Sequence, residues 1–413
     1  MKNSLTKYRT LVSNFSYLSI LELLSLLFPL ITYPYLIHIL GKELYGVVIY
    51  AQSVAAYLTI IVNFGFNISA TKDISINRDN IYSLSRIVNS IILLKLVLFL
   101  IIALPYVCII LLTNITYHKA LYIFSLGLCI QEVFFPTWFF QGVEKMKYIT
   151  LISFISRLCF LLLIFILVKS SSDYLYIPLF YTMGGIVSTL ISFYILKNKF
   201  KLLFFHERIN YLELKQLFKD SLPFFFSRFI NVVTEKTNTI LIGPLLGYEA
   251  VSTYDLGVKI INILRIPLSL VSQVLYPSVA KSRNLNLLKI SLKGVAVFSI
   301  VLIILIYFSA PYIVNFLGNG QLPEATKIVY MLSCILPFVG CSYILGASTL
   351  VVFGYTKEYN VSVLLGFISY ISIVLVSLFL YEITIQIMVT TFIIPEIVIC
   401  IYRFNKARQY NLL

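Results

Sequence analysis

The amino-acid sequence predicts an all-α polytopic membrane protein with twelve transmembrane helices in two six-helix bundles. Three observations support this fold class. The 413 residues are 60% hydrophobic and only 12% charged, far from the composition of soluble proteins. Apolar runs of about 20 residues, each long enough to cross a bilayer, recur along the whole chain. Lysine and arginine are also distributed unequally between the loops on alternate sides of these runs.

The expected spans follow one another with short connections that leave no room for a soluble domain. They cover residues 11–40, 44–71, 87–113, 117–141, 148–168, 174–196, 221–243, 250–279, 290–316, 325–353, 359–380 and 384–402. Proline recurs inside these spans, which predicts a scaffold of bent helices. The first run is too long for the apolar region of a cleavable signal peptide, so we expect it to act as a signal anchor.

The basic residues predict the topology. If the N-terminus is cytoplasmic, 22 of the 32 lysines and arginines lie in cytoplasmic loops and tails. The opposite side carries four, which are Lys42, Lys119, Lys169 and Lys327. This bias follows the positive-inside rule and predicts that both termini are cytoplasmic. The net charge of +15 is therefore interpreted as a topology signal and not as a nucleic-acid-binding surface.

The chain is expected to consist of two similar halves. We expect one transmembrane lobe at 1–196, a cytoplasmic amphipathic linker at 197–220 and a second lobe at 221–413. The stretch 40–43 (LGKE) follows the first span, and 246–249 (LGYE) follows the seventh, 206 residues later. Both halves would begin on the cytoplasmic side, which is typical of parallel repeats in transporters.

Six charged residues fall inside the two long apolar segments between Ser221 and Pro277: Arg228, Glu235, Lys236, Asp255, Lys259 and Arg265. A charge at the centre of a membrane helix costs about 2.5–3.5 kcal/mol on insertion scales, so six require a reason. Two acids cannot neutralise four bases. We expect a wet basic cavity that receives an anion such as phosphate and is lined by the four bases, Arg228, Lys236, Lys259 and Arg265. The alternative is that the charges pair and only fix the helix register.

Several carboxylates in the spans are candidates for carrying a coupling ion or for internal pairing: Glu22, Glu132, Glu235 and Asp255. For Glu132, pairing with Arg157 of the next span is an equally good interpretation, and Glu396 in the last span is similar. The aromatic run 134–140 (FFPTWFF) is expected to form an interfacial belt, although its rings could also stack on sugars.

No enzymatic activity, cofactor or metal is expected. The six cysteines all fall in apolar spans without a C-x-x-C pair, and the three histidines are scattered. The sequence also contains no nucleophile constellation and no Gly-rich phosphate loop.

Three stretches resemble the Wzx-type O-antigen flippases, a branch of the superfamily that also holds multidrug exporters and lipid II flippases. They are 29–36 (PLITYPYL) with the following Leu40-Gly41 and Tyr45-Gly46, 136–146 (PTWFFQGVEKM) and, more weakly, 275–277 (LYP). The resemblance covers essentially the whole chain. One departure is His38, which stands where family members often have an arginine.

This resemblance implies twelve helices in two six-helix lobes around a central cavity. It implies a substrate, undecaprenyl-diphosphate-linked oligosaccharide, that moves from the cytoplasmic to the periplasmic leaflet of the bacterial inner membrane. The expected partners are this substrate, membrane lipids, and the polysaccharide polymerase and chain-length machinery, with no nucleic acid. Two alternatives stay open: an ion-coupled exporter of small amphiphiles, and a membrane-embedded polymerase or glycosyltransferase.

Overall fold

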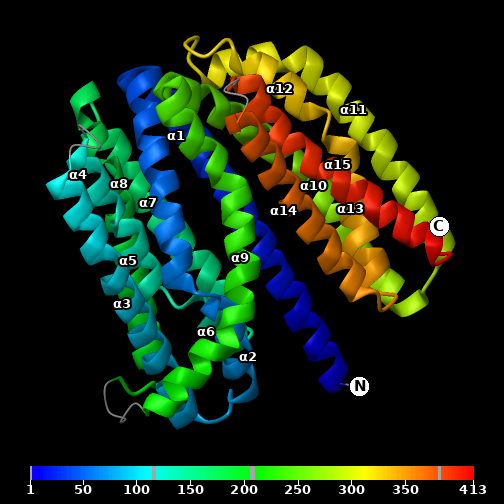
Figure 1. Cartoon of the computed structure of the whole chain (residues 1–413). Helices are drawn as coiled ribbons and strands as arrows, with labels where there is room; N and C mark the ends of the chain where they lie inside the picture. Colours follow the sequence, from blue (N-terminus) through cyan, green and yellow to red (C-terminus); the bar gives the residue numbers. More distant parts are fainter. Residues whose placement is uncertain (1, 114–117, 205–209, 380–382) are drawn as a thin grey trace. The chain divides into compact units, whose positions relative to one another are not determined.

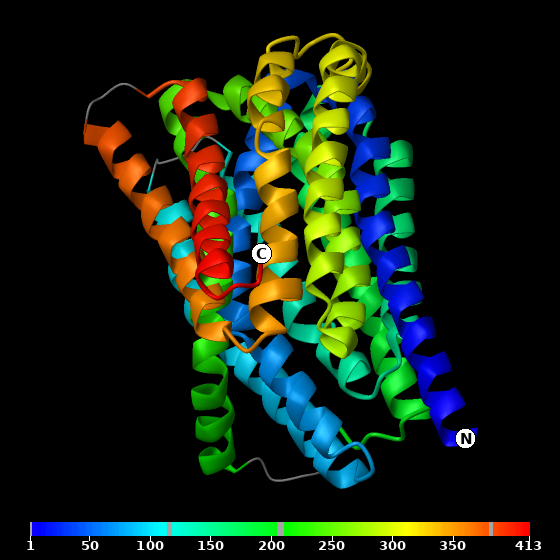
Figure 2. The same ribbon diagram turned by 90° about the vertical axis from the view of Figure 1, so that its right-hand side faces the viewer.

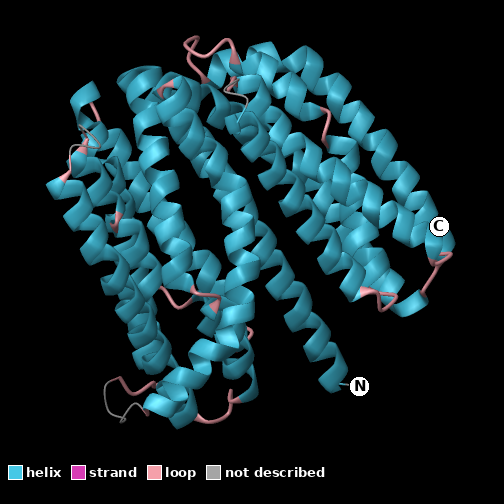
Figure 3. Cartoon of the chain, viewed as in Figure 1, coloured by secondary structure: helices cyan, strands magenta, loops and turns pink. Residues whose placement is uncertain are grey.

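The computed structural model describes residues 2–113, 118–204, 210–379 and 383–413. Its helices, in chain order, are α1 (Lys2–Asn63), α2 (Phe66–Ile76), α3 (Ile81–Leu112), α4 (Lys119–Ser125), α5 (Gly127–Phe134), α6 (Thr137–Gly142), α7 (Met146–Leu167), η1 (Ser171–Tyr176), α8 (Ile177–Asn198), α9 (Tyr211–Leu246), α10 (Tyr248–Ser282), α11 (Leu285–Leu317), α12 (Ala325–Ser333), α13 (Leu336–Tyr343), η2 (Ile344–Val351), α14 (Thr356–Phe379) and α15 (Ile385–Gln409). Figure 1 shows them along the chain, and Figure 3 shows no strand in the described residues. The all-α expectation is confirmed for this part of the chain.

Within the described residues, nine helices are long and apolar enough to cross a membrane. A tenth is counted if Ala325–Ser333 and Leu336–Val351, which are bent by 44°, form one span. Two features of the chain make this number smaller than the expected twelve. Ser16–Ile76 is counted as one span although it contains two expected ones, and α9 does not pass because its charged and polar residues lower its hydropathy.

Gly41 divides α1 into two helices. Its φ of 73° and ψ of 168° are not helical, and a positive φ is accessible to glycine at little cost. Gly247, between α9 and α10, has nearly the same conformation, with φ 89° and ψ 163°. The two glycines occupy the matching positions of LGKE and LGYE, so the two stretches share both sequence and backbone conformation.

Further elements repeat at nearly the same spacing. Asn80 caps α3 by accepting from the backbone N–H groups of Tyr82 and Ser83. Asn284 caps α11 by accepting from the backbone N–H of Leu287. Both helices contain a proline, Pro105 in α3 and Pro311 in α11, 206 residues apart. The following segment is broken in both halves, into α4, α5 and α6 and into α12, α13 and η2. This correspondence supports an internal duplication.

Contacts within the chain divide it into two compact units, Met1–Thr237 and Asn238–Leu413. The boundary lies inside α9, which runs without interruption from residue 211 of the expected linker through the expected span 221–243. The first part of α9 packs on the first unit: Phe64 stacks on Phe218 and Phe225 at centroid distances of 4.1 and 4.7 Å. In addition, the Ser69 and Ser221 hydroxyls lie 2.6 Å apart.

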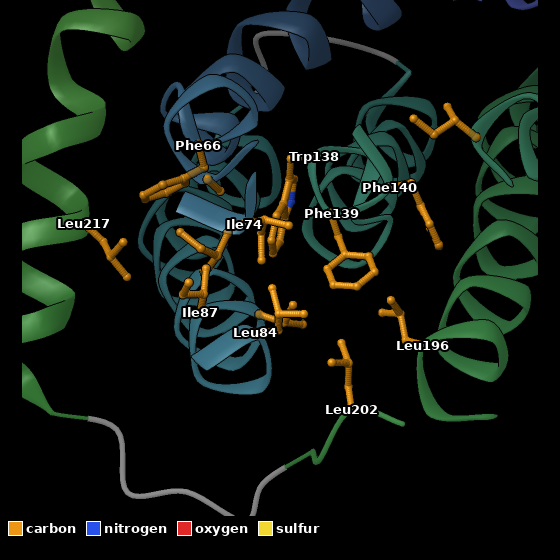
Figure 4. Close-up of a cluster of buried hydrophobic side chains, with 14 of the residues drawn as sticks. Phe66, Ile74, Leu84, Ile87, Trp138, Phe139, Phe140, Leu196, Leu202 and Leu217 are labelled. Atoms are coloured by element: carbon orange, nitrogen blue, oxygen red, sulfur yellow. The ribbon is translucent and has the colours of Figure 1, made fainter. Parts of the chain in front are cut away.

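In the first unit, the aromatic residues of α6 lie in the core. Trp138, Phe139 and Phe140 have exposed fractions of 1%, 0% and 0%, and Figure 4 shows them among apolar side chains such as Ile74 and Leu84. The expected interfacial belt is therefore wrong for these three residues. The chain turns at Phe135-Pro136 and directs α6 onto α2, where a Cβ at Gly142 would come within 2.5 Å of Ile74.

In the second unit, α14 and α15 lie side by side, with α13 against α15 (Figure 2). Asn238 of α9 links α10, α14 and α15, because it donates to the Tyr254 hydroxyl and the Met388 carbonyl, both at 2.9 Å. Its Oδ1 accepts from Tyr370 at 2.8 Å and from Thr391 at 3.0 Å. Every polar atom of this fully buried amide is thus satisfied.

Candidate functional site

On α9, the charged side chains differ in their partners. Lys236 Nζ lies 2.7 Å from Glu235 Oε1, and both side chains are partly exposed, at 35% and 54%. Arg228 is exposed and forms no ion pair with any described residue. It precedes Glu235 by two helical turns, so the two lie on one face of α9. Among the charged residues of the expected span 221–243, Arg228 is therefore the one without an ion-pair partner in the described residues.

On α10, the two basic side chains inside the expected span, Lys259 and Arg265, are paired. Lys259 Nζ lies 2.5 Å from Asp255 Oδ2, one helical turn away. Arg265 forms an ion pair with Glu396 of α15 and stacks over the Phe392 ring at 5.6 Å. The side chains of Arg265 and Glu396 are only 17% and 21% exposed.

These pairs change the expected charge balance. Three of the four bases between Ser221 and Pro277 have a carboxylate partner, because Glu396 supplies a third acid from a helix far along the chain. The expectation that only two acids oppose four bases is therefore wrong, and the surplus is one charge. In the described residues, Arg228 carries it.

In the first unit, Glu132 pairs with Lys95 and not with Arg157. Lys95 is completely buried, and its Nζ donates to Glu132 Oε1 at 2.8 Å, to the Glu132 carbonyl at 3.1 Å and to Asn67 Oδ1 at 3.2 Å. Asn63 Nδ2 donates to the same carboxylate oxygen at 2.7 Å. Arg157 instead donates to the Leu21 carbonyl at 3.5 Å. The ammonium thus has an acceptor for each of its three N–H groups.

Glu22 lies on the exposed side of α1 and has no ion-pair partner in the described part of the chain. The other three candidate carboxylates, Glu132, Glu235 and Asp255, are each paired with a lysine. Three of these four carboxylates are thus paired within the protein.

A pocket of about 460 Å³ with a mixed apolar and polar lining lies beside the Lys95–Glu132 pair, within the first unit. Its lining comes from α1, α5, α6 and α9 and from the turn before α6: Gln52, Ala56, Thr59, Ile60, Asn63, Leu128, Gln131, Glu132, Phe135, Thr137 and Val232. The side chains of Gln52 and Gln131 are half-buried and have no hydrogen-bond partner in the described residues. Sequence reasoning missed these two amides because it searched the spans for charges and not for neutral polar groups.

The comparison with known families is decisive. Residues 11–283, more than half of the chain, match the model of the family described as "Polysaccharide biosynthesis protein". The chain belongs to this family. Two curated proteins are similar to the chain, and both carry the provisional name of O-antigen transporter. That of Escherichia coli (strain K12) is 26% identical over 97% of this chain and 99% of its own length. That of Shigella dysenteriae is 29% identical over 62% of this chain and 64% of its own.

Solved structures show the fold of this polysaccharide biosynthesis family member. The lipid II flippase MurJ in an inward closed conformation matches with a TM-score of 0.71 at 18% identity, over 94% of this chain and 87% of that one. An inward-facing multidrug resistance MATE family transporter matches with a TM-score of 0.67 at 14% identity, over 92% and 97%. Together with the apolar helices, these likenesses identify a multi-pass membrane protein with the fold of transporters.

Proposed function

We propose that this protein is a flippase that moves undecaprenyl-diphosphate-linked oligosaccharide, an O-antigen repeat unit, across the bacterial inner membrane. Movement is from the cytoplasmic to the periplasmic leaflet. The observation that carries the proposal is the end-to-end similarity to a protein named as an O-antigen transporter. The likeness to a lipid II flippase supports a fold suited to lipid-linked sugars.

The proposal has a physical basis. A diphosphate with several sugars cannot cross hydrocarbon unaided, because burying ions and unpaired hydroxyls is very costly. A cavity must therefore hold the polar head while the polyprenyl tail stays in lipid. Arg228 is the side chain best placed to bind the diphosphate, since its forked donors are not engaged by an acid. The proposed basic cavity is completed by Lys236, Lys259 and Arg265. Each of these side chains would leave its carboxylate partner within the protein and donate to the substrate instead.

The proposal includes a topology. It has twelve spans in two six-helix lobes around a central cavity, with both termini cytoplasmic, as the positive-inside bias predicts. The repeated elements in the two halves support this arrangement, because alternating access in transporters commonly uses two related lobes. The proposed partners are the lipid-linked substrate, membrane lipids, and the polymerase and chain-length machinery. Glu22 is the carboxylate best placed for ion coupling.

Complementation tests the function. A strain that lacks its own flippase but makes the lipid-linked unit should recover surface polysaccharide when it expresses this chain. The measurement is surface polysaccharide normalised to the amount of this protein in the membrane. Absence of recovery across a panel of strains that differ only in their oligosaccharide unit, at normal membrane levels, would contradict the proposal.

Two further readouts separate the alternatives. Accumulation of single, unpolymerised units on the outer leaflet after deletion of the gene would indicate a polymerase. Increased drug susceptibility of the deletion strain, with normal surface polysaccharide, would indicate an exporter of small amphiphiles.

A further inference from the structure

We propose that the pocket beside the Lys95–Glu132 pair in the first unit binds a neutral sugar of the transported oligosaccharide, and that Gln52 and Gln131 select which sugar fits. This inference rests on the proposed function and assigns one part of the substrate to one set of residues. The volume of the pocket, about 460 Å³, lies in the range of about 300–1,000 Å³ typical of ligand pockets.

The hydrogen-bonding groups of the pocket match those of a sugar. Each glutamine amide offers two N–H donors and a carbonyl acceptor, and Thr137 offers a hydroxyl. None of these three side chains has a partner in the described residues, and they reach the pocket from α1, α5 and α6. Sugar hydroxyls both donate and accept, so they can satisfy all three groups. Phe135 adds an apolar ring to the lining, suited to the C–H face of a sugar.

The charges argue for an uncharged ligand. Glu132 is the charged residue in the lining, and Lys95 beside it balances its charge at 2.8 Å. All three N–H groups of Lys95 are used within the protein, so none is left for a phosphate. Glu132 Oε1 accepts from Lys95, Asn63 and Asn67, which lowers its value as a cation ligand. Oε2 has no partner in the described residues and can accept from a sugar hydroxyl.

The pocket and the proposed diphosphate contact share one helix, α9. Val232 lines the pocket, and Arg228 precedes it by four residues on the same helix. Residues four apart lie on the same helical face, about 6 Å apart along the axis. A diphosphate bound to Arg228 would therefore place the first sugars beside the pocket.

The first test uses complementation of two flippase-deficient strains whose oligosaccharide units differ in one sugar. Gln52→Ala and Gln131→Ala should each lower surface polysaccharide by about two- to tenfold, the effect expected for one or two hydrogen bonds. The loss should differ between the two strains, because a selective pocket distinguishes the sugars. The isosteric Gln131→Glu, which keeps side-chain size, should lose function in the same direction because it removes two donors.

The matched control is Gln386→Ala, which removes an exposed glutamine at the start of α15 and should behave as the wild type. Equal recovery by wild type and all pocket variants in both strains would overturn the sugar subsite while leaving the flippase function intact. Failure of the wild-type chain in every strain would overturn the function itself, so the two failures are distinguishable.

A binding measurement gives a second readout. The chain has one tryptophan, Trp138, which directly follows the pocket residue Thr137. Free oligosaccharide released from the lipid should change the Trp138 emission of the purified protein saturably, and Gln131→Ala should weaken this response. Sodium chloride and inorganic phosphate should produce no saturable change. A response to sodium that strengthens in Gln131→Glu, without one to oligosaccharide, would identify a cation site and contradict the inference.

Discussion

Arg228→Ala is expected to abolish most transport while the protein accumulates in the membrane at its normal level. Arg228 is exposed and has no acidic partner in the described residues, so its removal leaves no carboxylate unpaired. A hydrogen bond to a charged group contributes about 1.5–3 kcal/mol, or about ten- to a hundredfold in binding. The measurement is surface polysaccharide per unit of membrane protein in the complemented strain. Arg228→Lys should retain part of the function, because it keeps the charge and loses the fork.

Arg265→Ala provides the contrast. This substitution leaves Glu396 without its partner in a poorly exposed position, and breaking such a pair costs about 3–5 kcal/mol. The amount of folded protein should therefore fall, and function should fall with it. Full function of Arg228→Ala, or a loss explained entirely by lower protein level, would contradict the role assigned to Arg228.

Lys95→Met is expected to cause the largest loss of stability. It removes the donor to Glu132 and Asn67 in a completely buried position, and an uncompensated buried charge costs about 3–5 kcal/mol. Glu132→Gln should also destabilise the protein, because it leaves the Lys95 ammonium without its counter-charge. The double variant Lys95→Met, Glu132→Gln should lie closer to the wild type than either single variant. The measurement is the thermal unfolding temperature of the purified wild type, the two single variants and the double variant.

The double variant decides whether the pair acts as a unit. Residues in direct contact have strongly non-additive effects on the free energy of unfolding. Additive shifts in the unfolding temperature would show that Lys95 and Glu132 do not stabilise each other, and the explanation of the neutral pocket would then fail.

Much of the fold is predictable from the sequence, because apolar runs indicate the helices and the repeated stretches LGKE (40–43) and LGYE (246–249) indicate the two halves. The repeat is also present in the backbone, since Gly41 and Gly247 share a positive φ. The span boundaries were less predictable. Helix α9 is continuous through 211–246 and packs against Phe64 and Ser69, and this tertiary contact has no local sequence signal.

The charged site was only partly predictable. Charge in an apolar span identifies Arg228, Arg265 and Lys95, but periodicity does not say which helices will be neighbours. The partner of Arg265 is Glu396, 131 residues away, and that of Lys95 is Glu132. The burial of Trp138 depends likewise on the turn at Pro136, which directs an apparent interfacial run into the core.

The most direct measurement is transport by the purified protein in lipid vesicles. Lipid-linked oligosaccharide is placed in one leaflet, and its appearance in the other is followed with a sugar-modifying enzyme that cannot cross the membrane. We expect transfer that depends on the wild-type protein and is strongly reduced with Arg228→Ala at equal protein content. Transfer no faster than in protein-free vesicles, by protein that remains folded and correctly inserted, would contradict the assignment as a flippase.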